Sequence, residues 1–345
     1  MSDPLVSAEA PATAGPSGAT PVSGREPSPV ARVAREILRR YATVLLLIVL
    51  IVVFTILNDR FLTTTNLTNV LVTQAVIGCI TLAALLPLII GEFDLSLGYM
   101  VGFLAMLGAY LGGHTSSPAV IILAVLVGGI LIGAVNGVLT VRFKISSFIA
   151  TLGVGILLSG GTLGLSNGEV LFKSVPQVVK DVGTNRLAGV TLAVWLVLVL
   201  AIILLYLLEH TPLGRRWYAI GGSERVAFLA GVRTGRLKII AFALAGLLVG
   251  IGALVQLGST GSASPGFGVD LLLPAYAAAF LGVTTYRPGY YNVPGTLVAI
   301  LVLAVGFNGL SLLGVPFWVQ PLFNGGVLLV AVLAARAEAR QVRVG

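Results

Sequence analysis

Residues Val190–Leu208 read V-T-L-A-V-W-L-V-L-V-L-A-I-I-L-L-Y-L-L and contain no charged side chain. A hydrocarbon core about 30 Å thick is crossed by about 20 apolar residues in a helix. Stretches of the same kind recur at Val44–Leu57 and Leu297–Leu313. The whole chain is 57% hydrophobic and 10% charged, whereas a soluble domain is about 25% charged. The sequence therefore predicts an all-α polytopic membrane protein.

Ten segments are apolar enough to be predicted as membrane spans. With the N-terminus inside, seventeen of the 21 Lys and Arg residues fall on the inner side and four on the outer side, as the positive-inside rule expects. Removing one interior span spoils this asymmetry, which favours an even count with both termini cytoplasmic. The predicted spans are 41–57, 70–90, 96–112, 119–140, 147–165, 190–208, 238–257, 271–285, 294–313 and 318–335.

The two ends of the chain differ from the predicted membrane domain, residues 41–335. Residues 1–40 start with a stretch rich in Ala, Pro, Ser, Thr and Gly, which is typical of disordered segments, and end in a short basic helix. We expect a disordered cytoplasmic tail there and a short cytoplasmic tail over residues 336–345. The net charge is +8. Because the basic residues gather on the predicted inner side, this charge indicates membrane orientation, and we expect no nucleic acid as a partner.

Residue types that catalysis or metal binding requires are scarce. Cys79 is the single cysteine, so an internal disulfide and a cysteine-based metal cluster are excluded on count. His114 and His210 are predicted at opposite membrane faces, and the chain has no Gly-x-x-x-x-Gly-Lys-Ser/Thr sequence for nucleotide hydrolysis. We therefore expect no enzyme activity, no cofactor and no metal.

The segment G91-E-F-D-L-S-L-G98 places two acids between apolar segments. Ionisable groups are costly near a membrane and usually mark a pathway or a broken helix. One interpretation makes Asp94 the N-cap of a helix that begins at Leu95. The other gives Glu92 and Asp94 a role in the permeation route or its inner gate. The two are compatible, because broken helices line sites in many transporters.

A second polar group begins at Asn136–Gly137 and continues, after a tight basic turn, at Ser147, Phe148 and Thr151. Such side chains could line a hydrophilic route or serve close helix packing, and both interpretations stay open. Asn308 lies in a similar Asn-Gly pair. Other polar groups lie in or near the spans, and together they suit a neutral, hydroxyl-rich solute better than an ion, because interior acids and bases are nearly absent: Gln74, Gln256, Thr284, Thr285, Asn308, Gln320 and Asn324. The candidates for the pathway or gate are Glu92, Asp94, Ser96, Asn136, Phe148, Thr151 and Asn308.

The most polar internal connection is T211-P-L-G-R-R-W-Y-A-I-G-G-S-E-R-V-A-F-L-A-G-V-R-T-G-R-L-K238. Pro212 and Gly214 are expected to end the preceding span, and a short helix is expected over Arg215–Ala219. Gly221–Gly222 is then expected to turn the chain at positive φ.

A second short helix is expected at Ser223–Ala230, with Ser223 as its N-cap and a stop at Gly231. Its apolar residues Val226, Ala227, Phe228 and Leu229 require a partner surface or the lipid boundary. The residues alone leave two interpretations open. The segment is either an amphipathic helix held on the inner leaflet by arginines or a loop on which a partner docks.

Four ordered motifs, spread over roughly residues 41–335, resemble the permease subunits of ribose-type ABC importers. The 211–238 segment is similar to that family's coupling loop, G-R-x-x-Y-A-I-G-G-x-x-x-A-A-x-x-x-G. Gly91–Gly98 is similar to G-G-I-D-L-S-V-G, with Glu92 in place of the second glycine. Asn136–Gly137, Phe148–Gly153 and the 287–296 region match further signatures. The coupling-loop residues that the resemblance assigns are Gly214, Arg215, Tyr218, Ala219, Ile220, Gly221, Gly222, Ala227 and Gly231.

The resemblance implies a type II ABC importer-like permease in the plasma (inner) membrane. It implies a homodimer or heterodimer of permeases, two cytoplasmic ATPase subunits, and an extracytoplasmic solute-binding protein. The solute would be a monosaccharide, pentose- or hexose-like. A branched-chain amino acid permease of the same fold is the alternative, followed by an ion-coupled secondary carrier, for which Asp94 is almost the only candidate ligand. An integral membrane enzyme is disfavoured.

Overall fold

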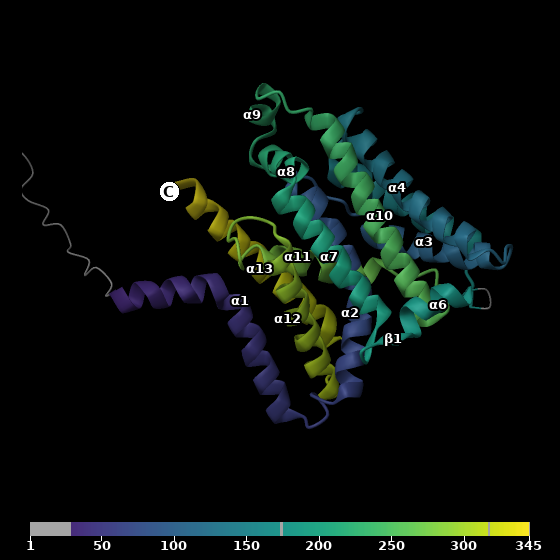
Figure 1. Ribbon diagram of the computed structural model, residues 1–345, viewed down its shortest axis with the longest axis horizontal. Helices are drawn as coiled ribbons and strands as arrows, with labels where there is room; N and C mark the ends of the chain where they lie inside the picture. The colour runs from purple at the N-terminus through teal and green to yellow at the C-terminus, as the bar shows by residue number, and fades with distance from the viewer. Residues whose placement is uncertain (1–28, 173–174, 317, 345) are drawn as a thin grey trace, which may run out of the picture.

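The computed structural model describes residues 29–172, 175–316 and 318–344, and these ranges are mainly helical (Figure 1). Ten of the helices coincide with the ten predicted spans. They are α1 (Pro29–Leu57), α2 (Thr64–Ile89), α3 (Leu97–Gly112), α4 (Pro118–Val141), α5 (Ser147–Ser166), α7 (Leu192–His210), α10 (Thr234–Thr260), α11 (Leu272–Gly282), α12 (Val293–Leu312) and α13 (Val319–Val344).

The remaining elements are short and lie in the connections. The connection between α5 and α7 holds α6 (Gln177–Thr184) and an antiparallel pair of two-residue strands, β1 (Arg186–Leu187) and β2 (Val190–Thr191). A 3₁₀ turn, η1 (Val269–Leu271), precedes α11. The 211–238 segment holds α8 (Pro212–Gly222) and α9 (Glu224–Leu229).

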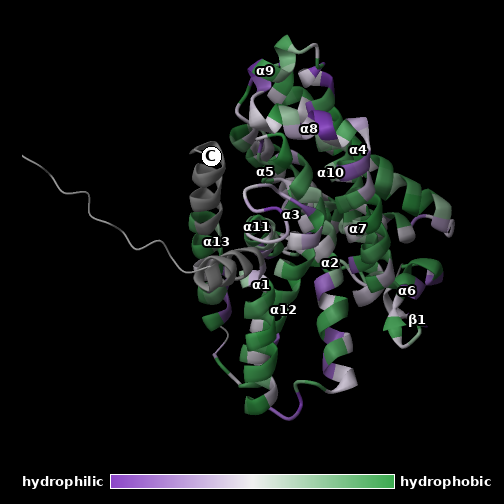
Figure 2. Ribbon diagram, turned by 60° about the vertical axis from the view of Figure 1, so that its left-hand side comes forward, coloured by the Kyte–Doolittle hydropathy of each residue, from purple (hydrophilic) through white to green (hydrophobic). Residues whose placement is uncertain are grey.

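Six helices in the described residues, α2, α4, α5, α7, α10 and α12, are long and apolar enough to cross a membrane. Four further apolar stretches, in α1, α3, η1–α11 and α13, are shorter, at 10–17 residues. Hydrophobic residues dominate the long helices in Figure 2. The all-α polytopic architecture is thus confirmed, while a total of ten crossings stays a prediction.

Two predicted boundaries at the ends of the chain change. The predicted basic helix is continuous with the first span, because α1 runs unbroken from Pro29 to Leu57. At the other end α13 continues through the predicted C-terminal tail to Val344. The predicted disordered segment covers residues 1–30, of which 1–28 lie outside the described residues, as does Gly345.

Small residues allow a close helix crossing between α4 and α10. A Cβ atom on Gly133 would collide with the backbone carbonyl of Phe242, and one on Gly246 would collide with that of Gly129. Lipid is as apolar as leucine, so helices in a membrane associate through such close backbone packing. α2 also packs on α10 and is buried over most of its length.

The 27-residue helix α10 connects the two ends of the bundle. Its first turns lie beside α8 and α9, at the top of Figure 1, and its last turns pack on α6. The end of α2 also lies at the α8 end, since Gly221 abuts the Ile89 carbonyl. We call the end that carries α8 and α9 the coupling end.

Candidate functional site

The connection between α2 and α3, residues 90–96, holds a fully buried carboxyl group, Asp94. Its Oδ1 accepts hydrogen bonds from the Ser96 backbone N–H (3.0 Å) and from Ser96 Oγ (2.6 Å). Asn136 reaches in from α4, and its Nδ2 donates to Ser96 Oγ (2.8 Å) and to both Asp94 oxygens (3.3 and 3.4 Å). Three of the predicted pathway residues therefore form one hydrogen-bonded cluster.

The predicted N-cap role of Asp94 is wrong in its details. Helix α3 begins at Leu97 and not at Leu95, and Ser96 occupies the N-cap position without a side-chain capping bond. Asp94 instead bonds the N–H two residues ahead of it, which is the geometry that an Asx turn uses. Burial raises the pKa of the Asp94 carboxyl to about 6, although the hydrogen bonds from Ser96 and Asn136 lower it.

Tyr276 of α11 holds the same connection from its other side, and the sequence prediction missed it. Its hydroxyl accepts from the Asp94 N–H (2.9 Å) and donates to the Asp94 carbonyl oxygen (3.0 Å). The Tyr276 ring stacks on Phe93, with 6.0 Å between ring centroids. The available signal was a phenol in the apolar run L272-L-P-A-Y-A-A-A-F280, because a buried tyrosine hydroxyl usually finds a partner.

The start of α5 is fastened to the same connection. Ser147 Oγ accepts from the Phe93 N–H (3.2 Å), and Thr151 Oγ1 accepts from the Leu95 N–H (2.9 Å). Thr151 is buried, whereas Phe148 is 52% exposed. Thr151 thus holds the backbone of the 90–96 connection beside the Asp94 cluster, whereas Phe148 is exposed.

Asn308 lies far from this cluster. It pairs with Asn66 in the first turn of α2, through reciprocal side-chain amide bonds of 2.8 and 2.9 Å. The Asp94 connection follows the last turn of the same 26-residue helix. Asn308 is therefore placed as a link between α12 and α2 at the opposite end of the bundle.

The 211–238 segment is fixed to the bundle through the inner face of α8. Trp217 is fully buried, and its Nε1 donates to the Leu237 carbonyl of α10 (2.9 Å). Gly214 and Ile220 are buried beside it. Arg215, Ala219 and Gly222 are exposed, at spacings that share one face of a helix. The predicted coupling residues thus divide into an anchored set and an exposed set.

Two predictions on this segment are corrected. Thr211, and not Pro212 or Gly214, separates α7 from α8, since Pro212 is the first residue of α8. Gly221 and Gly222 do not turn the chain, because both lie inside α8 without a positive φ. A Cβ atom on Gly221 would collide with the Ile89 carbonyl of α2, whereas one on Gly222 would meet no atom within 4 Å.

Tyr218 ties α8 to the connection between α11 and α12. Its hydroxyl donates to the Tyr291 carbonyl oxygen (2.7 Å). Burial raises the pKa of Tyr218 to about 12, against a smaller lowering by Arg287, so the phenol stays a donor at neutral pH. Arg287 pairs with Glu209 at the end of α7, at 3.5 Å.

Helix α9 carries the outward-facing apolar surface. Ser223 is its N-cap, as predicted, and accepts from the Val226 N–H. Val226, Phe228 and Leu229 are exposed, at 64, 66 and 76%. Ala227 was expected on this surface but is buried, because it faces the protein. The chain leaves α9 at Gly231 with φ +82°.

The polar side chains at these sites are hydroxyl, phenol, amide and charged groups, and the charged groups include the Arg287–Glu209 pair. Among the described residues, no group of three or more His, Cys, Asp and Glu side chains could hold a metal ion.

Comparison with known proteins agrees with this picture. A profile of the family described as "Branched-chain amino acid transport system / permease component" matches residues 66–332. The ribose import permease protein RbsC of Escherichia coli K12 is 34% identical over 83% of this chain and 90% of its own length. The ribose permease of Bacillus subtilis is 33% identical over 85 and 91%, and the L-arabinose ABC transporter permease protein AraH of Azospirillum brasilense is 30% identical over 89 and 91%. No solved structure matches the chain.

The family match covers most of the chain, and the relatives are matched over nearly their full length. The apolar helices agree with a multi-pass protein of the plasma (inner) membrane. The chain belongs to the family of branched-chain amino acid transport system permease components.

Proposed function

We propose that this chain is the membrane-spanning subunit of an ATP-driven importer for a monosaccharide. The curated relatives reported above are named for ribose and arabinose, and a further one for D-allose. All three are neutral, hydroxyl-rich solutes. Hydroxyl and amide groups such as those of Ser96, Asn136 and Thr151 can hydrogen-bond such a solute, although all three are buried in this structure.

The observation that carries the proposal is the construction of the coupling end. α8 is bound to α2, α10 and the 283–292 connection, while α9 presents Val226, Phe228 and Leu229 to the outside. An exposed apolar group of this kind marks an interaction surface. A partner that pushes on α9 would move a rigid, anchored unit and not a loose loop.

The partners follow from this arrangement. Residues 211–238 would form the coupling loop within a membrane domain of residues 41–335. Two cytoplasmic ATPase subunits would dock on the coupling loops of a permease dimer, and an extracytoplasmic solute-binding protein would deliver the solute. We propose ten spans with both termini in the cytoplasm, as the distribution of Lys and Arg predicts.

A branched-chain amino acid is the second candidate solute, because the family description names this class. The two candidates differ in the charge that the route must accept. An amino acid carries an ammonium and a carboxylate group, whereas a sugar carries neither.

Uptake of a labelled panel separates the candidates. A strain that lacks this chain is compared with the same strain carrying it, using ribose, arabinose, allose and leucine. We expect restored uptake of at least one of the sugars and no change for leucine. Uptake of leucine alone would contradict the sugar proposal.

A further inference from the structure

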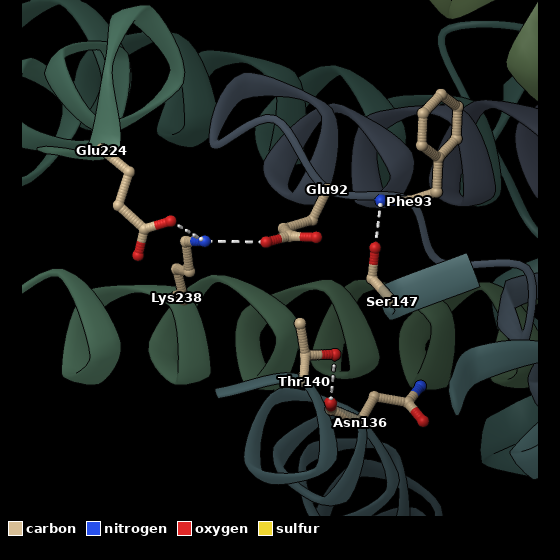
Figure 3. Close-up of polar contacts among 7 residues, drawn as sticks. All are labelled: Glu92, Phe93, Asn136, Thr140, Ser147, Glu224 and Lys238. Atoms are coloured by element: carbon tan, nitrogen blue, oxygen red, sulfur yellow. Dashed lines mark hydrogen bonds and ion pairs between the residues drawn. The ribbon is translucent and has the colours of Figure 1, made fainter. Parts of the chain in front are cut away.

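Lys238 joins three elements at the coupling end (Figure 3). It lies in the second turn of α10, and its residue is 7% exposed. The Nζ atom lies 2.7 Å from Glu92 Oε1 in the 90–96 connection and 2.6 Å from Glu224 Oε2 in the first turn of α9. One ammonium group thus bridges the outermost helix of the coupling loop and the connection that contains Asp94.

Each end of this bridge is attached to something further. Glu224 follows Ser223, which caps α9. Glu92 precedes Phe93, whose backbone N–H donates to Ser147 Oγ at the start of α5. A continuous set of polar contacts therefore runs from α9 through Lys238 and Glu92 to α5. The contacts between Glu224, Lys238 and Glu92, and the bond from Phe93 to Ser147, are drawn in Figure 3.

The burial of Lys238 and the partial burial of Glu92 distinguish this bridge from a surface ion pair. The Lys238 and Glu92 side chains are 9 and 18% exposed, and Glu224 is 51% exposed. Exposed ion pairs contribute little, whereas removing one member of a buried pair leaves an uncompensated charge. Loss of Lys238 would leave two carboxylates beside each other without a cation between them.

The bridge also lies against free space. A cavity of about 370 Å³ is lined by all three bridge residues together with Thr140, Lys144 and Ser146. Protein interiors are close-packed, so helices that shift need room of this kind. The bridge can therefore move with α9 without forcing a core to repack.

We propose that Lys238 is a positioning residue that transmits displacement of α9 to the 90–96 connection and the start of α5, through its contacts with Glu224 and Glu92. The inference rests on the proposed function, in which an ATPase partner moves the coupling loop. The measurement that reports this role is the ratio of solute transported to ATP hydrolysed. If the link is broken, the ATPase continues to hydrolyse ATP but the transport pathway no longer opens and closes with it.

The test uses the complete transporter in liposomes, with labelled ribose or whichever panel sugar the strain accumulates. Uptake and ATP hydrolysis are measured together for the wild type, Lys238→Met, Glu224→Gln and Glu92→Gln. Arg60→Met is the control, since Arg60 is an exposed arginine outside residues 211–238, in the connection between α1 and α2, and its replacement removes the same charge. Thermal unfolding and size exclusion report whether each variant is folded.

We expect Lys238→Met and Glu224→Gln to lower the uptake per ATP about two- to thirtyfold, the range seen when a coupling contact is removed. Arg60→Met should keep the wild-type ratio. The uptake per ATP of the Glu92→Gln, Glu224→Gln double variant should be no lower than that of either single variant. The two contacts act in series, so breaking the second one adds nothing once the first is broken.

Two results would overturn the inference. One is a folded Glu224→Gln variant with the wild-type ratio, which remains informative if Lys238→Met does not fold. The other is a loss of uptake and of ATP hydrolysis in equal proportion to the loss of folded protein, which would show that the bridge residues only stabilise the fold. If the wild-type complex shows no ATP-dependent uptake, the proposed function fails first, before any variant is compared.

Discussion

At the scale of single residues, the two adjacent glycines of α8 differ in what surrounds them. A side chain on Gly221 would meet the Ile89 carbonyl, whereas a side chain on Gly222 would meet open space. Forcing a methyl group into a filled site costs about 1–3 kcal/mol. In a helix with free space, alanine is favoured over glycine by about 1 kcal/mol.

We therefore expect Gly221→Ala to lower the thermal stability of the purified protein and Gly222→Ala to leave it equal or higher. Unfolding followed by intrinsic fluorescence in detergent would measure both. Equal losses for the two variants would show that α8 is not packed against the end of α2.

These glycines also show where residue-level prediction stops. The sequence marks both as special, but their role depends on a contact with α2, more than 130 positions away in the chain. The same holds for Asn308, whose partner Asn66 cannot be found from spacing. Ser223 was predicted correctly as an N-cap, because capping depends on the few residues that follow it.

At the scale of elements, α9 is six residues long, which is too short to be stable as an isolated helix. Its cap at Ser223 and its contacts through Ala227 and Glu224 must hold it. Replacing a capping serine by alanine costs about 0.5–2 kcal/mol.

Ser223→Ala should accordingly speed amide exchange over residues 224–229. Ser117→Ala is a matched control, because Ser117 stands at the N-cap of α4 without a side-chain capping bond, and should leave exchange in α4 unchanged. Unaltered exchange in α9 after Ser223→Ala would mean that packing alone fixes this helix.

Most elements were predictable because apolar runs of about 20 residues leave a chain in lipid no alternative to a helix. The wrong predictions concern helix boundaries, at positions where contacts outside the apolar runs determine where a helix begins or ends. α3 starts two residues later than expected because Asp94 bonds ahead to Ser96. α8 extends through both glycines because α2 and α10 support it.

At the scale of the whole molecule, the proposed orientation makes opposite predictions for two connections. Cys79, the native cysteine, is fully buried, so added cysteines can be labelled selectively. We expect Glu169→Cys to react with a membrane-impermeant maleimide in intact spheroplasts and Arg225→Cys to react only after permeabilisation. Labelling of both positions from the same side would contradict the ten-span arrangement.

The central claim concerns the source of energy, and purified components test it most directly. Labelled sugar is supplied with its binding protein to liposomes that contain the permease, with and without the ATPase subunits and ATP. Accumulation against a gradient should require both the ATPase and hydrolysable ATP. Accumulation by the permease alone would contradict the account, because the coupling end would then have no work to transmit.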